Sequence, residues 1–491
     1  MTTAMRARHT ARVLALMALT ILITGLPAQR AAADEPLDTE AIDRFVDSYA
    51  QRHGLPGISI AVTKDGEPVH EYATGGDGTP LTARSPMAIA SATKMITAFA
   101  VLQQVDAGKI GLDDRVADHL PAFKVGDPRG DAITVRQLLS HTSGLPNPVV
   151  VAPADSPQEY LQQLGSWQLS SDPGTAHLYS NANYHLAARL VEVLTDQSFA
   201  AYLEDQVFTP LGMHDTRYVN SVAGEPGADA GHITAYGTAF GLQEMTQLNG
   251  GAGGVISSAH DLARWLAMQQ RGGVTADGTR MLSEDLVEES HRPQPGSPSG
   301  GLGWEHTQTA DPARVGHDGT LTSYSSRGDL VPSSGYGVVV LLDSFTTTWS
   351  HPFSISTGII DISEGDAAEV GAPVPTIVDA VLGLITIGVL ALVVRGLLRS
   401  DRWVQRRREW PAWRFGLRLL PQLIMPVVAV GAFVVLPLLQ NNTATAADVL
   451  GIWPAATILL LVSGVSGLAL STVRVVRRTS RPDNDPLFSE R

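Results

Sequence analysis

The 491-residue sequence contains no cysteine, and lysine is scarce. The absence of cysteine excludes disulfides, thiol catalysis and cysteine-based metal sites, so the stability of the fold must come from burial of its core. The lysines are Lys64, Lys94, Lys109 and Lys124, and none follows residue 124. Any function that needs a lysine side chain therefore depends on one of these four positions.

Basic side chains are also scarce between residues 34 and 374. This region has 18 Lys and Arg against 42 Asp and Glu, so its charge balance is 18 − 42 = −24. Such an excess of negative charge repels nucleic acid and anionic lipid, and we expect neither as a partner of this region. The chain also lacks a His-Glu-x-x-His motif and a carboxylate cluster, so we expect no metal and no cofactor.

The N-terminus has the order of a secretory signal. Three arginines precede an apolar core over residues 13–23, which is followed by Ala31-Ala32-Ala33. We expect residues 1–33 to be a signal peptide. The alternative is an uncleaved anchor, for which the apolar core is short. Both interpretations place the chain from Asp34 onward outside the cytoplasm.

Long apolar runs occur only near the C-terminus, after a linker that we expect over residues 346–375. The runs cover residues 376–394, 419–439 and 450–472. Each is about 20 residues long, the length of a membrane-spanning helix, so we expect a region of three transmembrane helices over 376–472.

Arginines set the orientation of these helices. Arginine-rich segments follow the first and the third apolar run, whereas the loop over residues 440–449 has no basic residue. The positive-inside rule places both arginine-rich segments in the cytoplasm. We therefore expect a multi-pass protein of the cell membrane, with residues 34–345 outside and a cytoplasmic tail over 473–491.

Residues 34–345 alternate between helix and strand signals. β-Branched runs at 57–62 and 335–342 predict strands near both ends of this region. Helical patterns lie between them, among them residues 93–105 and 259–270. We expect an α+β domain in which the two ends of the region form an antiparallel sheet around a helical insertion.

The segment Ser91-Ala92-Thr93-Lys94 carries the first chemical signal. Residues three apart on a helix share a face, so the ammonium group of Lys94 can approach the Ser91 oxygen. The N-terminus of a helix also favours an oxyanion that forms beside Ser91. The pattern by itself is weak, because serine is a common helix cap.

Two later motifs add specificity: Tyr179-Ser180-Asn181 and His317-Asp318-Gly319. With these motifs in the order S-x-x-K, Y-x-N and H-x-G, the sequence resembles the penicillin-binding protein and class C β-lactamase superfamily of serine hydrolases. The stretches 138–146, 250–255 and 301–304 match as well. The resemblance covers residues 42–343. It implies a β-lactamase/transpeptidase-like fold, in which helices flank an antiparallel sheet.

The resemblance also implies roles for the first two motifs. Ser91 is the nucleophile that becomes acylated, and Lys94 and Tyr179 share the proton transfers as base and acid. A phenol with a pKa of about 10 serves as a base only if nearby cations lower its pKa, and Lys94 and a protonated His317 are the candidates. The sequence leaves open whether Lys94 or Tyr179 takes the first proton. Asn181 is expected to orient Lys94 and the substrate.

The third motif is expected to bind the substrate through His317, Gly319 and Thr320. By resemblance, the backbone N–H groups of Ser91 and Thr320 form the oxyanion hole. Members of the superfamily that act on β-lactams generally have Lys-Thr-Gly at this place, whereas this chain has a titrating imidazole and the additional anion of Asp318. His141 and Ser143 are a further pair on one loop, for which we favour a structural role over a catalytic dyad.

The sequence thus predicts a membrane-tethered serine hydrolase that acts outside the cytoplasm. Its substrates would be small peptides or esters, among them peptides of the cell envelope that contain D-amino acids or derive from peptidoglycan. One alternative is a β-lactamase or a penicillin-binding DD-peptidase. A second, from a different class, is a non-catalytic membrane sensor that only binds a ligand.

Overall fold

The computed structural model describes residues 36–76, 78–147, 154, 156–226, 231–431 and 452–480. The chain divides into two units, Met1–Asp38 and Thr39–Arg491. The signal peptide predicted over residues 1–33 lies outside the described residues.

A six-stranded antiparallel sheet organises the region after Thr39. Its strands are β1 (Gly57–Lys64), β2 (Glu67–Gly75), β8 (Glu305–Thr307), β9 (Arg314–Thr320), β10 (Ser325–Val331) and β11 (Tyr336–Leu342). They are arranged in the order β2-β1-β11-β10-β9-β8. The first strand therefore pairs with the last long strand, with Ile60 opposite Val340. The expected antiparallel sheet built from both ends of the region is confirmed.

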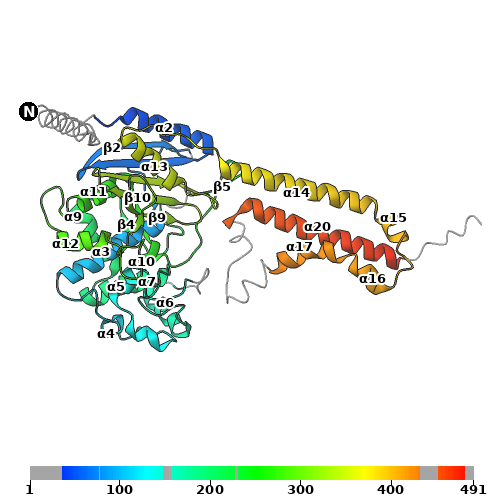
Figure 1. Ribbon diagram of the computed structural model, residues 1–491, viewed down its shortest axis with the longest axis horizontal. Coiled ribbons are helices and arrows are strands. Elements are labelled where there is room, and N and C mark those ends of the chain that lie inside the picture. The colour runs from blue at the N-terminus through cyan, green and yellow to red at the C-terminus, as the bar shows by residue number, and fades with distance from the viewer. Residues whose placement is uncertain are drawn as a thin grey trace, which may run out of the picture. The chain divides into compact units, whose positions relative to one another are not determined.

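Helices cover both faces of this sheet (Figure 1). The helices α2 (Thr39–His53) and α13 (His351–Ser363) pack on one face, and α11 (Ala259–Gln270) packs on the other. Strand β1 is buried along almost its whole length, because both of its faces are covered. Alternate side chains of a strand point to opposite faces, which explains why this strand is mostly apolar without alternation between apolar and polar residues.

The remaining elements are mostly helical and lie between β2 and β8 in the sequence. They are β3 (Met87–Ala88), η1 (Ala90–Ala92), α3 (Thr93–Asp106), α4 (Val116–His119), η2 (Pro128–Ala132), α5 (Val135–Leu139), α6 (Pro157–Gln163), η3 (Leu164–Ser166), α7 (Asn181–Thr195), α8 (Phe199–Leu203), η4 (Glu204–Phe208), α9 (Thr209–Leu211), β4 (Arg217–Tyr218), β5 (His232–Ala235), β6 (Thr238–Gly241), α10 (Gly250–Gly253), β7 (Val255–Ser257) and α12 (Glu284–His291). Helix α3 is buried around most of its circumference, so it forms the centre of the main core.

The linker predicted over residues 346–375 requires a correction. Strand β12 (Ser344–Phe345) is followed directly by α13, which packs on β10 and β11. The reason is a buried ionic network: the Asp329 carboxylate on β10 accepts hydrogen bonds from Arg327 at 2.6 Å and from Ser356 of α13 at 2.5 Å. A segment rich in serine and threonine is therefore part of the folded domain.

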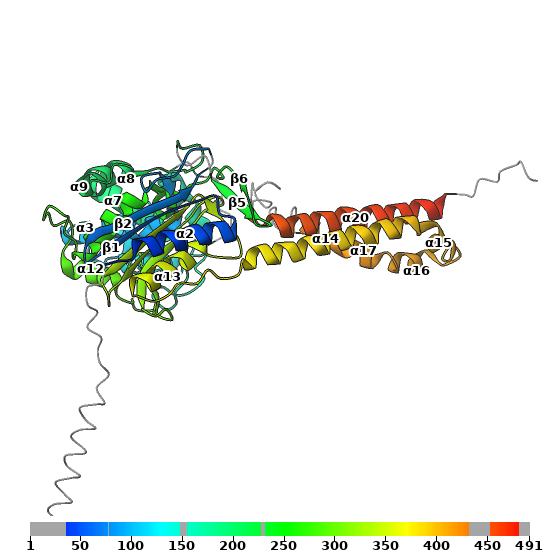
Figure 2. The same cartoon turned by 90° about the horizontal axis from the view of Figure 1, so that it is seen from above.

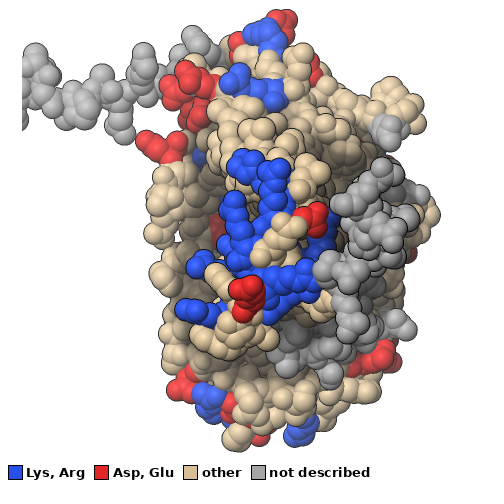
Figure 3. All heavy atoms as spheres, turned by 90° about the vertical axis from the view of Figure 1, so that its right-hand side faces the viewer, with Lys and Arg blue, Asp and Glu red and all other residues tan. Residues whose placement is uncertain are grey.

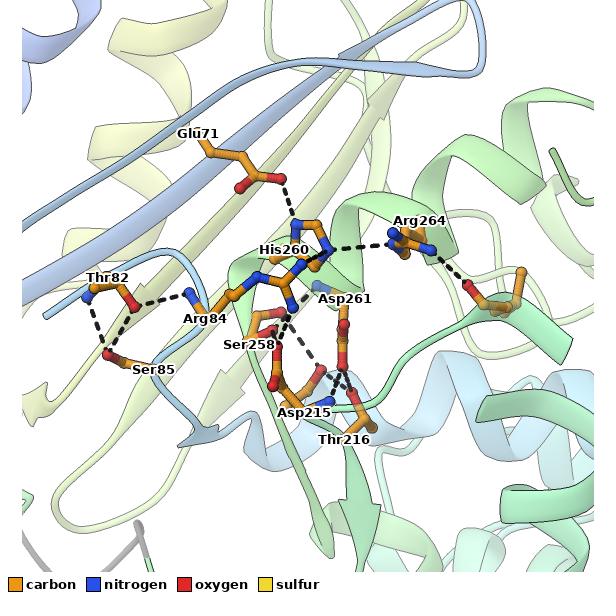
Figure 4. A network of polar contacts seen from close by, with 12 residues as sticks. Glu71, Thr82, Arg84, Ser85, Asp215, Thr216, Ser258, His260, Asp261 and Arg264 are labelled. Atoms are coloured by element: carbon orange, nitrogen blue, oxygen red, sulfur yellow. Dashed lines mark hydrogen bonds and ion pairs between the residues drawn. The ribbon is translucent and has the colours of Figure 1, made fainter. Parts of the chain in front are cut away.

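A polar network ties four segments together without disulfides (Figure 4). Arg84 contacts Asp215 at 3.1 Å and the His260 ring at 2.8 Å, and the other nitrogen of His260 lies 2.7 Å from Glu71 of β2. The Asp261 carboxylate accepts a hydrogen bond from Thr216 at 2.8 Å. These contacts fix the loop that leads into β3 and Ser91 against the start of α11.

Two described helices are long and apolar enough to cross a membrane: α14 (Val374–Leu398) and α20 (Pro454–Thr479). They lie side by side (Figures 1 and 2). We predicted three such helices. The second prediction, over residues 419–439, includes α17 (Leu420–Val430), which is shorter than a span, and residues 432–439 lie outside the described residues. The short helices α15 (Ser400–Gln405) and α16 (Ala412–Leu417) lie between α14 and α17.

Candidate active site

Ser91 lies in the short 3-10 helix η1, immediately before α3. The residue before it, Ala90, is completely buried and has a φ of 49°, in the left-handed region that is costly for any residue with a Cβ atom. The main sheet approaches η1 from the β9 side. The chain therefore presents the Ser91 side chain at a tight turn, held between the sheet and the start of a buried helix.

The structure brings the three predicted catalytic residues together. Ser91 Oγ lies 3.0 Å from Lys94 Nζ and accepts a hydrogen bond of 2.9 Å from the Tyr179 hydroxyl group. Lys94 Nζ also donates a hydrogen bond of 2.8 Å to the backbone carbonyl of Ala252 in α10. Both candidate proton acceptors therefore contact the serine oxygen directly.

Burial decides the protonation state of Lys94. Its side chain is inaccessible to solvent, and this burial lowers its pKa from 10.5 to about 7, against a smaller opposite effect of the Glu305 carboxylate. A substantial fraction of the side chain is then the neutral amine near pH 7. A neutral amine that contacts a serine hydroxyl group can act as a general base.

The environment of Tyr179 does not lower its pKa, as a role as the base would require. Burial raises the pKa of Tyr179, and the Glu305 carboxylate acts in the same direction, whereas the hydrogen bond with Ser91 lowers it. The nitrogen of Lys94 lies 4.8 Å from the centre of the Tyr179 ring. Because Lys94 is itself partly neutral, it supplies less cationic stabilisation than we expected. The phenol therefore stays protonated and is suited to donate a proton.

His317 lies beside Tyr179 on strand β9. Its ring centre is 6.4 Å from that of Tyr179, and its side chain is 5% exposed. The Nδ1 atom lies 2.6 Å from the backbone oxygen of Asp318. Burial lowers the pKa of His317, although Glu305 raises it. The third motif therefore presents a neutral imidazole near pH 7, where a lysine motif would present a cation.

Asp318 points away from this site. Its neighbours His317 and Gly319 face η1 and Tyr179, so the side chain of Asp318 lies on the opposite face of the strand. There its carboxylate lies 2.8 Å from the guanidinium group of Arg327, the residue opposite it on β10. The additional negative charge noted in the sequence is thus paired with Arg327.

Gly319 is required for the approach of β9 to the nucleophile. A Cβ atom at this position would lie 2.0 Å from the backbone oxygen of Ile89 and 2.3 Å from Ser326 Oγ. Strand β8 pairs with residues Arg314 to Gly316 of β9, and no other described strand pairs with His317 to Thr320 on that side. Strand β9 also contacts η1. The oxyanion hole formed by the N–H groups of Ser91 and Thr320 stays a prediction.

Asn181 begins helix α7, two residues after Tyr179. Its backbone N–H group donates to the side chain of Asn147 at 3.2 Å, and its buried Oδ1 atom has no hydrogen-bond partner among the described residues. The hydrogen bonds of Lys94 within the described chain go to Ser91 and Ala252. The structure thus shows the backbone carbonyl of Ala252 as a hydrogen-bond partner of Lys94. The orientation of Lys94 and of the substrate by Asn181 stays a prediction.

His141 and Ser143 support Tyr179 and are not arranged as a dyad. The His141 ring is buried and stacks on the Tyr179 ring, with centres 4.4 Å apart and planes at 29°. Its Nδ1 atom accepts hydrogen bonds from the N–H group of Ser180 at 3.1 Å and from the amide of Asn183 at 3.0 Å. Ser143 Oγ donates to the same Asn183 side chain at 2.6 Å. This geometry agrees with the structural role that we favoured.

Glu305 is a candidate residue that the motifs did not reveal. It begins β8 opposite Gly316, its side chain is 44% exposed, and its carboxylate lies 3.9 Å from His317 Nε2. It directly follows the matched stretch 301–304, which is the one signal that could have drawn attention to it. The site thus combines a half-buried nucleophile with an accessible carboxylate at the third motif.

Comparisons with known proteins give relatives of this chain. Penicillin-binding protein 4 from Amycolatopsis lactamdurans is 32% identical over 326 residues, which cover 62% of this chain and 85% of that protein. Protein flp from Staphylococcus aureus is 28% identical over 319 residues, and the matched part covers 62% of each protein.

A solved structure and a family model complete the comparison. The octameric penicillin-binding protein homologue from Pyrococcus abyssi aligns over 69% of this chain and 80% of its own, with a TM-score of 0.58 and 24% identity, which establishes the shared fold. The family model named Beta-lactamase matches residues 42–354, the region that contains all three motifs. The chain therefore belongs to the beta-lactamase family, which is a family of serine hydrolases.

Proposed function

We propose that this protein is a membrane-tethered serine hydrolase that acts through an acyl-enzyme on Ser91. The observation that carries the proposal is the contact of Ser91 Oγ with both Lys94 and Tyr179. Burial lowers the pKa of Lys94 to about 7 and raises the pKa of Tyr179. One neighbour can therefore accept the serine proton while the other still holds a proton to donate.

The reaction follows from these protonation states. Neutral Lys94 accepts the proton of Ser91 as Ser91 Oγ forms a bond to the substrate carbonyl carbon. The Tyr179 phenol donates its proton to the leaving nitrogen or oxygen as the bond between this atom and the carbonyl carbon breaks. The proton on Lys94 then moves to the Tyr179 phenolate. Water then attacks the carbonyl carbon of the acyl-enzyme ester, with Lys94 again as proton acceptor and Tyr179 as proton donor to Ser91 Oγ. This step releases the acid and restores Ser91.

Substrate preference follows from the charges at the third motif. A neutral His317 supplies no permanent cation for a substrate carboxylate, and the accessible carboxylate of Glu305 repels one. The same carboxylate attracts an amine. We therefore propose that the substrates are uncharged esters or peptides with a free amino group near the scissile bond, among them D-amino-acid peptides of the cell envelope.

A β-lactamase or penicillin-binding DD-peptidase is the second candidate. The similarity to Penicillin-binding protein 4 favours it. The third candidate, a non-catalytic sensor, would bind the same ligands without turnover.

The test is a comparison of substrates with the purified protein and with its Ser91→Ala variant. We expect hydrolysis of short-chain esters and D-amino-acid peptides to exceed that of penicillins, and to disappear in the variant. Faster hydrolysis of penicillins would replace the proposal with the second candidate. Equal turnover by the variant would exclude Ser91 chemistry altogether.

We also propose that the catalytic domain lies outside the cell membrane. Support comes from the two candidate spans and from the basic segments after α14 and at the end of α20. In this arrangement the substrate is met outside the cytoplasm, where envelope peptides occur.

A further inference from the structure

Eleven arginines gather where the two candidate spans end. Residues 395–418 and 474–480 contain these 11 arginines, no lysine and two acidic residues, Asp401 and Glu409, which gives a balance of 11 − 2 = +9. Figure 3 shows basic side chains gathered in a patch on the side of the molecule that carries these helix ends. This surface contrasts with the acidic balance of the catalytic region.

The arginines are ordered by aromatic rings. The guanidinium carbons of Arg407 and Arg474 lie 4.4 and 4.3 Å from the centre of the Trp403 ring. Arg478 lies 4.3 Å from the centre of the Phe415 ring, and the Trp403 and Phe415 rings are 5.4 Å apart. These five residues form the arginine–aromatic cluster. Cation–π contacts hold its guanidinium groups in fixed positions.

Among the described residues, no acidic side chain pairs with the two arginines on Trp403. Arg474 is 8% exposed, and the buried Nε atoms of Arg407 and Arg474 have no hydrogen-bond partner in the described part of the chain. The carboxylate of Asp401 pairs with Arg477, at 2.8 Å. Arg474 is buried and Arg407 is half-buried, and two adjacent cations that are partly removed from water without an anion are costly. A ligand with negative charge would remove this cost.

The surroundings identify the kind of anion. The cluster lies at the C-terminal ends of α14 and α20. Both helices are long and apolar enough to cross a membrane. On α16, Trp413 is 66% exposed and Leu417 is 54% exposed. Exposed apolar side chains beside arginines are typical of segments that lie at a membrane surface, and they would have no partner in an aqueous complex with nucleic acid.

We propose that the arginine–aromatic cluster is a binding site for the phosphodiester headgroup of an anionic phospholipid. The guanidinium groups of Arg407 and Arg474 bind the phosphate oxygens, for which the arginine fork is well suited. Trp413 and Leu417 lie against the acyl region. This inference rests on the membrane tether proposed above, and it adds a specific lipid site to that tether.

The experiment uses the full chain in a neutral detergent. Dioctanoyl phosphatidylglycerol and dioctanoyl phosphatidylcholine are titrated separately, and bound lipid is counted by native mass spectrometry. Inorganic phosphate is added as a competitor. The test variant is Arg407→Gln with Arg474→Gln. The matched control is Arg399→Gln with Arg402→Gln, which removes the same charge from two exposed residues of the same surface.

We expect phosphatidylglycerol to bind the unchanged protein at least tenfold more tightly than phosphatidylcholine and to raise its melting temperature. The test variant should lose at least tenfold in affinity for phosphatidylglycerol, and the control less than threefold. Equal binding of both lipids would overturn the proposal. An equal loss of affinity for phosphatidylglycerol in both variants would also overturn it, because it would indicate attraction by diffuse charge only. Competition by millimolar phosphate would assign the site to free phosphate instead.

Two measurements separate this proposal from the function proposed above. If the chain leaves the membrane fraction on alkaline washing, the tether itself fails. If the chain stays in the membrane and Ser91 is labelled by an acylating probe, but no preference for phosphatidylglycerol exists, the lipid site alone fails. The melting-temperature shift of the unchanged protein tests the site even if the variant does not fold.

Discussion

At the scale of single residues, the burial of Lys94 has a direct kinetic consequence. With a pKa of about 7, Lys94 is protonated below pH 7 and neutral above it. Acylation of Ser91 should therefore rise about tenfold per pH unit below pH 7 and become constant above about pH 8. The measurement is the rate of labelling by an uncharged ester over pH 5 to 9. A rise centred near pH 10 would contradict a lowered pKa.

The same pKa shift predicts how stability changes with pH. The pKa of Lys94 is lower in the folded state than in the unfolded state. Burial of the protonated side chain therefore destabilises the fold, and this destabilisation is complete below pH 7 and disappears as the pH rises toward 10.5. The substitution Lys94→Met should therefore increase the free energy of unfolding by a few kcal/mol at pH 7 and by much less at pH 10. Denaturant titrations at the two pH values measure this difference. An equal gain at both would show that Lys94 is not perturbed.

Glu305 is expected to select substrates by charge. Glu305→Gln should lower kcat/KM for peptides with a free amine about five- to thirtyfold relative to their N-acetylated forms, which corresponds to about 1 to 2 kcal/mol. The control is Glu288→Gln, which changes an exposed carboxylate on α12 that pairs with Arg292. If both variants treat the two substrates alike, Glu305 does not contact the amine.

At the scale of elements, β9 lies in close contact with the chain before Ser91. Gly319→Ala would place a methyl group against the backbone oxygen of Ile89, which cannot move without displacing the nucleophile. We expect Ser91 labelling to fall at least a hundredfold, with about 1 to 3 kcal/mol lost from the free energy of unfolding. Gly328→Ala on β10 is the control, because its new atom would meet Met95 at an ordinary 3.4 Å. Comparable effects of the two changes would contradict the account of β9.

The elements also show which features could be predicted from the sequence. The sheet could be predicted, because the β-branched run of β1 and the apolar run of β11 allow few other structures. Helix α13 could not be predicted, because the composition of this segment is typical of a linker. Its place in the domain depends on long-range contacts such as the hydrogen bond of Ser356 with the buried Asp329 carboxylate of β10. Long-range packing overrides local propensity in such a segment.

The site divides in the same way. Ser91, Lys94 and Tyr179 could be predicted because their motifs resemble those of a known family, and the structure places them in contact. The Ala252 carbonyl and Glu305 reach the site from distant segments whose contacts no local pattern encodes. The direction of the Tyr179 pKa shift also could not be predicted, since it depends on burial.

At the scale of the whole molecule, the membrane topology can be tested with reporter fusions. A fusion after Trp410 and another after Arg478 should be cytoplasmic, and a fusion near residue 444 should be external. The physical reason is the concentration of arginines in the first two segments and their absence from the third. An external signal after Trp410 would invert the topology and place the catalytic domain in the cytoplasm.

The central claim is that Ser91 forms a covalent acyl-enzyme. The most direct measurement is mass spectrometry of the whole protein after treatment with a fluorophosphonate or a slow acylating ester, followed by peptide mapping. The account predicts one adduct per chain on the peptide that contains Ser91, and none in the Ser91→Ala variant. An adduct on Ser143, or one that persists in Ser91→Ala, would contradict it.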